Sequence, residues 1–154
     1  MRTLILYATK YGATAEIAQR IAWKMDGAVV YDLKQDNIPL LEGFDCIILG
    51  SSVYAGNIRK EAGTFAAKNA AELGKKTVGL FLSGLRADVD ALNKKYPPGF
   101  AEKAKAKGFL GGIFDPQKCS GPERFIMKMA AKLTEYTDSI DDEAIDRFIA
   151  AIRE

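Results

Sequence analysis

The sequence predicts a three-layer α/β/α sandwich around a five-stranded parallel sheet. Short apolar segments alternate along the 154 residues with segments of helical periodicity, and parallel strands need such crossover connections. The apolar segments are also continuously apolar, which is typical of strands that helices cover on both faces. We expect a single domain over residues 1–154 with strand order 2-1-3-4-5. An insertion at about residues 115–137 separates the fifth strand from the last helix.

The strands are assigned to apolar runs that turn residues bound on either side. The first run lies next to the N-terminus, and the third, which begins at Cys46, is apolar throughout. The expected strands are Thr3–Ala8, 28–32, 46–50, Thr77–Ser83 and 109–114.

Helices are expected between these strands and at the end of the chain. One begins at about Arg59, a short one spans residues 98–107, and the last runs to Arg153 from a capping box of Ser139 and Asp142. The helix after the first strand carries a buried stripe, since apolar residues recur there at helical spacing. This stripe comprises Ile17, Ala18, Ile21, Ala22 and Met25.

Composition excludes several classes of function. The chain has no histidine, which excludes histidine-based triads, metal sites and general bases. A net charge of +2 without a basic stripe argues against nucleic acid as a partner. No apolar run reaches the about 18 residues of a membrane span, and no signal peptide is visible. Cys46 in a core strand and Cys119 in a loop do not form a disulfide framework, so we expect a cytoplasmic location.

The turn between the first strand and the first helix predicts a phosphate-binding loop. Backbone N–H groups at a helix start, together with the helix dipole, favour an anion, and Thr9, Gly12 and Thr14 add hydroxyls and a close backbone approach. The run lacks the glycine patterns of ATP-type and Rossmann loops. The alternative is a helix start that these residues merely cap. The loop reads Thr9, Lys10, Tyr11, Gly12, Ala13 and Thr14.

Two further loops should meet the phosphate loop, because ligands of such sheets bind at the carboxyl edge where the winding reverses. In the loop after the third strand, Tyr54 is expected to stack on a planar ring, or else to be an ordinary rim aromatic. In the loop after the fourth strand, Leu85 is expected to cover the other face of the ring, although a plain turn is equally compatible. The candidate residues of the two loops are Ser52, Val53, Tyr54, Ala55, Gly56, Ser83, Gly84, Leu85 and Arg86.

The insertion contains a basic amphipathic helix over residues 122–133, from Pro122 to Leu133. Such a helix can lie on an anionic membrane or a partner, while the simpler alternative packs it on its own domain. Its basic face carries Arg124, Lys128 and Lys132, and its apolar face Phe125, Ile126, Met129, Ala130 and Leu133.

These motifs resemble the flavodoxin family. The run Thr9-x-x-Gly12-x-Thr14 resembles the T-x-T-G-x-T loop that holds the phosphate of FMN, with Tyr11 in place of the middle threonine. The run from Gly50 to Gly56 is similar to a G-[AS]-S-[IV]-x-x-G loop. The run Arg124-Phe125-Ile126-Met127-Lys128 is similar to the R-F-x-x-K helix of the branch that includes menaquinone-dependent protoporphyrinogen oxidase.

The resemblance implies a flavodoxin-like fold and FMN as cofactor, held by the three loops. It also implies an FMN-dependent oxidoreductase related to protoporphyrinogen dehydrogenase. The expected redox partner is a quinone, a porphyrinogen or an electron-transfer protein, with peripheral contact at the inner face of the membrane through Pro122 to Leu133. Arg86 and the +2 charge favour this enzyme over a low-potential carrier, because an acidic surround is what lowers a flavin potential.

Three alternatives differ in class. The first is a flavodoxin-type electron carrier between redox proteins. The second is a binding domain that has lost its flavin, which the colour of the purified protein would reveal. The third, a phosphotransfer receiver, is excluded because Thr9-Lys10, Gly50-Ser51 and Phe114-Asp115 stand where its acidic residues and lysine are required.

Overall fold

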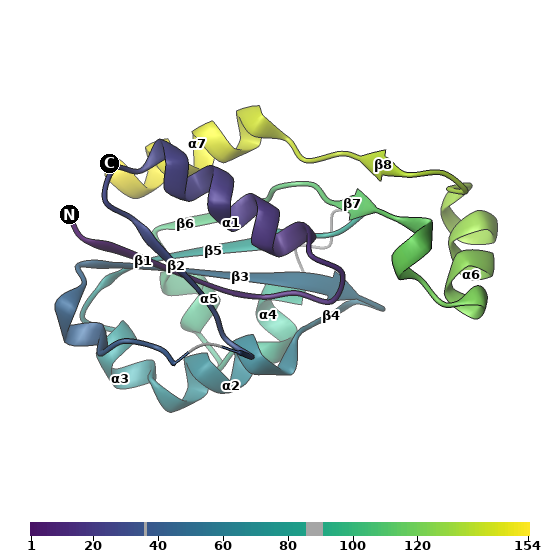
Figure 1. Cartoon of the computed structure of the whole chain (residues 1–154). Coiled ribbons are helices and arrows are strands. Elements are labelled where there is room, and N and C mark those ends of the chain that lie inside the picture. Colours follow the sequence, from purple (N-terminus) through teal and green to yellow (C-terminus); the bar gives the residue numbers. More distant parts are fainter. Residues whose placement is uncertain (36, 86–90) are drawn as a thin grey trace.

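A mainly parallel sheet divides the molecule into two helical layers (Figure 1). The computed structural model describes residues 1–35, 37–85 and 91–154. The parallel strands are β1 (Thr3–Ala8), β2 (Val29–Asp32), β3 (Cys46–Tyr54), β5 (Thr77–Ser83) and β6 (Ala106–Phe109). They lie in the order β2-β1-β3-β5-β6, which confirms the predicted topology. The short β4 (Asn57–Ile58) pairs antiparallel with the end of β3.

The helices form the outer layers. On one face of the sheet lie α1 (Ala13–Lys24) and α7 (Asp142–Arg153), and on the other lie α2 (Lys60–Lys68), α3 (Ala70–Leu73), α4 (Ala91–Lys95) and α5 (Phe100–Lys103) (Figure 1). A 3-10 turn, η1 (Leu41–Gly43), leads into β3. Within the ranges that the structure describes, no helix has the length and apolar character that crossing a bilayer requires.

Two hydrophobic cores explain why the strands are continuously apolar. Alternate residues of a strand point to opposite faces, and helices cover both faces here. In β1, Leu4 and Leu6 belong to the core under α2, whereas Ile5 belongs to the core under α1 and α7. In β3, Ile47 and Ile48 divide between the same two cores, so no face of the central strands is left for polar residues.

The fifth strand was predicted in the wrong place. The structure has β6 at Ala106–Phe109, and the expected short helix over 98–107 shrinks to α5. The sequence misleads because β6 is an edge strand that contains Lys107 and Gly108, and a glycine directly after a helical pattern is typical of a helix end. Gly108 is a packing position instead, since a Cβ there would lie 3.1 Å from the side chain of Leu110 and 3.4 Å from that of Phe148.

Two helix boundaries also differ from the prediction. The helix expected from Arg59 is broken at Asn69, whose side-chain amide donates a 2.9 Å hydrogen bond to the carbonyl of Phe65. The last helix is capped by Asp141, whose carboxylate accepts a hydrogen bond from the Ala144 N–H at 2.9 Å. The expected cap, Ser139, donates to the carbonyl of Gly112 instead.

The insertion stands on a two-stranded ribbon. Of the predicted fifth strand, Phe109 ends β6 and the last two residues form β7 (Ile113–Phe114), which pairs antiparallel with β8 (Thr137–Asp138). Between them lie the 3-10 turn η2 (Pro116–Lys118) and the helix α6 (Gly121–Ala131). Figure 1 shows α6 beyond the carboxyl edge of the sheet, away from both helical layers.

The close packing of β3 against β5 gives a stability prediction. A Cβ on Gly50 would overlap the ring of Phe81, which is fully buried, so Gly50→Ala forces the core to repack. We expect a loss of about 1–3 kcal/mol in the free energy of unfolding, measured by urea titration. Gly43→Ala is the control, because nothing lies within 4 Å of a Cβ there. Equal stability of the two variants would contradict this account of the sheet.

Candidate cofactor site

The first helix begins with open backbone donors. Gly12 is its N-cap with φ 101°, a left-handed conformation that favours glycine, and no side chain caps the helix. The hydroxyl of Thr9 accepts a 2.9 Å hydrogen bond from the Gly12 N–H, one residue before the first turn. The N–H groups of that turn therefore remain directed at the carboxyl edge of the sheet, where the helix dipole favours an anion.

A buried hydrogen bond joins the loop after β1 to the end of β5. The hydroxyls of Thr14 and Ser83 lie 2.7 Å apart, and the Thr14 residue is 0% exposed. Ser83 is buried as well, so this hydrogen bond fixes the start of α1 against the end of β5. The structure thus brings the first and third predicted loops together.

A second hydrogen bond joins the loop after β1 to β3. The backbone N–H of Lys10 donates to the hydroxyl of Ser52 at 3.2 Å. The neighbouring Ser51 is buried, and its hydroxyl accepts a 2.8 Å hydrogen bond from the Arg59 N–H at the start of α2. All three predicted loops therefore meet at one edge.

The segment after the third strand is a hairpin rather than an open loop. Strand β3 continues through Val53 to Tyr54, and Tyr54 pairs with Asn57 across the turn. Ala55 and Gly56 form the turn with φ of 51° and 76°, and positive φ at both positions is typical of a type I′ hairpin. Because Ala55 stands where such turns usually have glycine or asparagine, the sequence carries no hairpin signal here.

The ring of Tyr54 lies at this hairpin and is partly covered by a cation. Tyr54 is 43% exposed, and the Lys10 ammonium nitrogen lies 3.3 Å from its ring centroid. The same nitrogen lies 3.7 Å from a carboxylate oxygen of Glu123 in α6. A planar ligand on that face of Tyr54 must therefore displace the side chain of Lys10.

The loop after β5 offers fewer groups for contact with a ligand than the sequence predicts. The N–H of Gly84 already donates to the carbonyl of Gly111 at 3.0 Å, so only its carbonyl is left for a ligand. Leu85 is half-buried. The remaining candidate, Arg86, lies outside the described residues.

Sequence reasoning missed one residue of this edge, Lys118 of the insertion. Its ammonium donates a 3.1 Å hydrogen bond to the carbonyl of Tyr11, across a separation of 107 residues. No spacing rule connects residues so far apart. The only local signal is the turn that positions Lys118, in which the carboxylate of Asp115 accepts from the Gln117 N–H at 3.0 Å.

The hydroxyl of Tyr11 is a further feature of the loop. It is buried, and within the described part of the chain it has no hydrogen-bond partner. Unpartnered buried hydroxyls are costly, and they are most easily explained by a ligand or water that the protein holds. The open turn of α1 and the ammonium of Lys118 together suit an anionic ligand.

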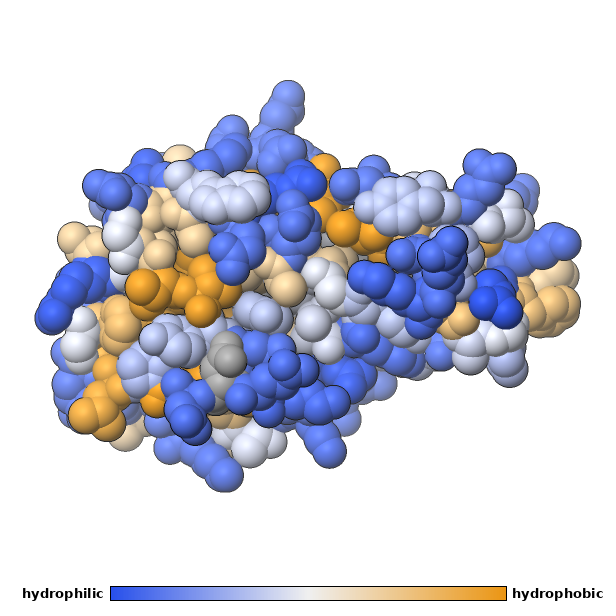
Figure 2. Space-filling view, viewed as in Figure 1, coloured by the Kyte–Doolittle hydropathy of each residue, from blue (hydrophilic) through white to orange (hydrophobic). Residues whose placement is uncertain are grey.

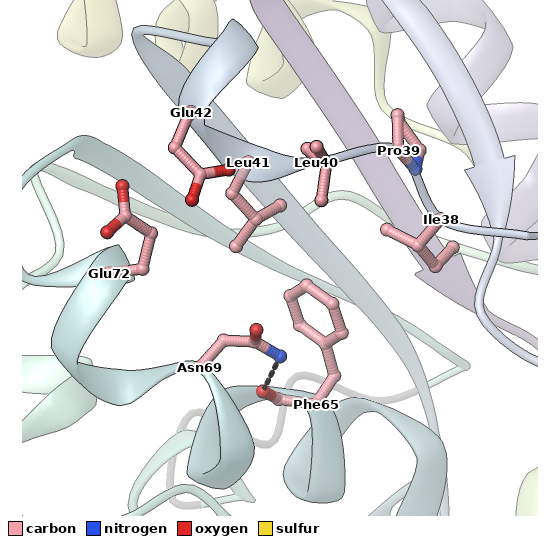
Figure 3. A pocket seen from close by; sticks show the side chains of 8 residues that line it. All are labelled: Ile38, Pro39, Leu40, Leu41, Glu42, Phe65, Asn69 and Glu72. Carbon is pink, nitrogen blue, oxygen red and sulfur yellow. Dashed lines mark hydrogen bonds between the residues drawn. The ribbon is translucent and has the colours of Figure 1, made fainter.

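A pocket lies at the amino edge of the sheet, opposite the loops described above. It has a volume of about 300 Å³ and is formed where η1 and α3 precede β3 and β5, between residues 38–42 and Phe65, Asn69 and Glu72 (Figure 3). The carboxylate of Glu72 is held by Lys75 and Lys76 at 3.0 and 3.4 Å, so it presents no unpaired charge to the pocket. The carboxyl edge remains the candidate site.

Comparison with known proteins agrees with this geometry. The profile of the flavodoxin domain family matches residues 4–141. The chain belongs to the flavodoxin domain family. No curated protein matches it.

Solved structures described as flavodoxins or flavoproteins share the fold of this chain. A short-chain flavodoxin associated with a bacterial microcompartment has a TM-score of 0.61 at 13% identity, over 99% of this chain and 97% of its own. The Lactobacillus acidophilus flavoprotein, in complex with FMN, has a TM-score of 0.51 at 20% identity, over 71% and 90%. A mutant of the Fusobacterium nucleatum flavodoxin, bound to FMN, has a TM-score of 0.53 at 18% identity, over 99% and 95%.

Cys46 cannot act as a reactive thiol at the site, because it is buried in the core. The thiol is 0% exposed, and desolvation raises its pKa to about 11. Cys119 lies in the insertion and is half-buried.

This difference between the two thiols is measurable. At pH 8 in the folded protein, a thiol reagent should titrate Cys119 and leave Cys46 unmodified, because Cys46 is both protonated and inaccessible. In denaturant both should react. Rapid modification of two thiols in the folded state would contradict the burial of β3.

Proposed function

We propose that this chain binds FMN at the carboxyl edge of its sheet and carries electrons between redox proteins. The observation that supports this most directly is the convergence of three loops on the uncapped start of α1. FMN is the cofactor, and its phosphate occupies this start, where N–H donors and Lys118 are available. Membership of the flavodoxin domain family supports the same assignment.

The protein holds and orients the cofactor, while FMN supplies the redox chemistry when bound. The first turn of α1 and the hydroxyl of Thr9 bind the phosphate, while the buried hydroxyl of Thr14 holds the start of the helix against Ser83. Tyr54 supports the isoalloxazine ring by stacking, and Ser52 fixes the spacing between the two loops. Gly84 and Leu85 border the ring from the side of β5.

An electron carrier is favoured over the oxidoreductase that the sequence suggested. The structural relatives from the microcompartment and from Fusobacterium nucleatum are described as flavodoxins. The link to protoporphyrinogen oxidation depends on sequence resemblance, of which the short motif in α6 is the most specific part, and on the net charge of +2. Oxidation of a porphyrinogen, coupled to a quinone, remains the second candidate, because α6 has a surface that a carrier does not require.

This surface is the apolar face of α6. No residue of the helix is buried, and Phe125, Ile126 and Met129 are 65%, 55% and 67% exposed. A groove of about 220 Å³ runs beside it, between Phe114, Pro116 and Leu133. Figure 2 shows apolar surface next to hydrophilic surface at the right-hand end of the molecule, where Figure 1 places α6.

The exposed face favours peripheral contact with an anionic membrane. Lys128 lies in α6 and Lys132 is the residue that caps its C-terminus, and both would meet the lipid headgroups while the apolar side chains enter the interface. Arg124 is less available, since its guanidinium donates to the carbonyls of Pro116 and Cys119 at 3.2 and 3.1 Å. Such contact would bring a quinone dissolved in the membrane close to the flavin edge.

Cofactor binding gives the first test. The purified protein should bind FMN, measured by quenching of flavin fluorescence, and Thr9→Ala should weaken binding by about 1.5–3 kcal/mol, as for a hydrogen bond to a charged group. Thr14→Ala should also weaken binding, because it removes the hydrogen bond to Ser83 that fixes the start of α1. Thr64→Ala, at an exposed position of α2, is the control. The assignment of the loop is wrong if both site variants bind FMN as the wild type does.

Stacking gives the second test. Tyr54→Ala should weaken FMN binding and change the fluorescence of the bound flavin, because the aromatic surface is lost. Tyr136→Ala removes a comparably exposed ring from the insertion and should change neither. If Tyr54→Ala behaves like this control, Tyr54 is a rim residue.

Membrane contact gives the third test. Lys128→Gln with Lys132→Gln should weaken the free energy of binding to anionic vesicles, measured by co-sedimentation, by roughly 2 kcal/mol, at about 1 kcal/mol for each charge. The melting temperature should stay unchanged because both side chains are exposed. Lys94→Gln with Lys95→Gln, in α4, controls for total charge. Unchanged co-sedimentation would show that membrane contact is wrong, while the proposed electron-carrier function would still stand.

A further inference from the structure

The insertion reaches back to the cofactor loop through the turn η2. The backbone of this turn is fixed locally, since the Lys118 N–H donates to the carbonyl of Asp115 at 3.1 Å. The side chain of Lys118 then extends to the start of α1. Its ammonium lies 3.1 Å from the carbonyl oxygen of Tyr11 and 3.4 Å from where a Cβ on Gly12 would stand.

The two lysines at this edge differ in their partners. The ammonium of Lys10 already faces a carboxylate of Glu123 at 3.7 Å and the ring of Tyr54. The ammonium of Lys118 contacts a neutral carbonyl, and no carboxylate of the described residues lies within ion-pair distance of it. Lys118 therefore retains the charge that an anion at the helix start would meet.

We propose that Lys118 is a ligand of the FMN phosphate, so that the insertion completes the cofactor site. This inference rests on the proposed binding of FMN. An ammonium has three donors, so Lys118 can keep its hydrogen bond to Tyr11 while it donates a second to a phosphate oxygen. The helix start alone offers about half of a positive charge, against the roughly 1.5 to 2 negative charges of a phosphate monoester at pH 7.

If the ammonium of Lys118 binds the phosphate, its removal should change two properties of FMN binding. Removal of the ammonium should weaken FMN binding about tenfold, as expected for loss of a hydrogen bond to a charged group. It should also flatten the dependence of FMN affinity on salt, because ionic screening acts on the lost pair. A purely structural lysine would change neither the affinity nor this slope.

The experiment measures FMN dissociation constants by fluorescence titration at low and high NaCl for four proteins. They are the wild type, Lys118→Met, Lys118→Arg and Lys128→Met, and thermal melts verify that each is folded. Lys128→Met removes the same charge from the same insertion at an exposed position. We expect a tenfold loss and a flatter salt dependence in Lys118→Met alone, with Lys118→Arg close to the wild type.

Each contrary result has a distinct meaning. If the wild type binds FMN and Lys118→Met stays within twofold of it, the role of Lys118 is wrong and the proposed function stands. An equal loss in Lys128→Met would reduce the effect to net charge and also overturn the role. If the wild type does not bind FMN, the proposed function fails and the inference fails with it.

Discussion

Burial of both faces of the central strands is the constraint on which the rest of this structure depends. Strands β1, β3 and β5 send alternate side chains into two separate cores, so helices must cover each side. Parallel strands with such crossovers end at the same edge, and the three following loops are thereby brought together. The hydrogen bond between Thr14 and Ser83 then fixes the start of α1 against the end of β5.

The sequence was informative wherever the signal was local or periodic. The topology, the first four parallel strands and a helix start at the turn Thr9–Thr14 all follow from apolar runs and turn residues. The edge strand β6 was misplaced because an edge tolerates Lys107 and Gly108, which interrupt the apolar pattern. The contacts of Lys10 and Lys118 were not predictable, since they join segments that only the folded sheet edge brings together.

The helix α6 depends on few contacts for its position. An isolated helix of 11 residues is marginal in water, and this one buries no side chain. Its stability comes from local bonds instead: Ser120 caps its first turn by accepting from the Glu123 N–H at 3.2 Å, and Arg124 ties it to η2. Among the described residues, Glu123 of α6 and Lys118 of η2 tie the insertion to the loop after β1, so the insertion and this loop depend on the same few interactions.

The ribbon of β7 and β8 separates the insertion from the parallel sheet, so that sequence changes in one need not affect the other. Its base is rigid, because Gly111 and Gly112 pack against the backbones of Ser139 and Gly84 with no room for a side chain. The chain enters and leaves the insertion through one antiparallel pair, so segments of different length can be exchanged above it without altering the register of the parallel sheet. Recognition of a partner can therefore diverge within the insertion while the sheet and its loops stay the same.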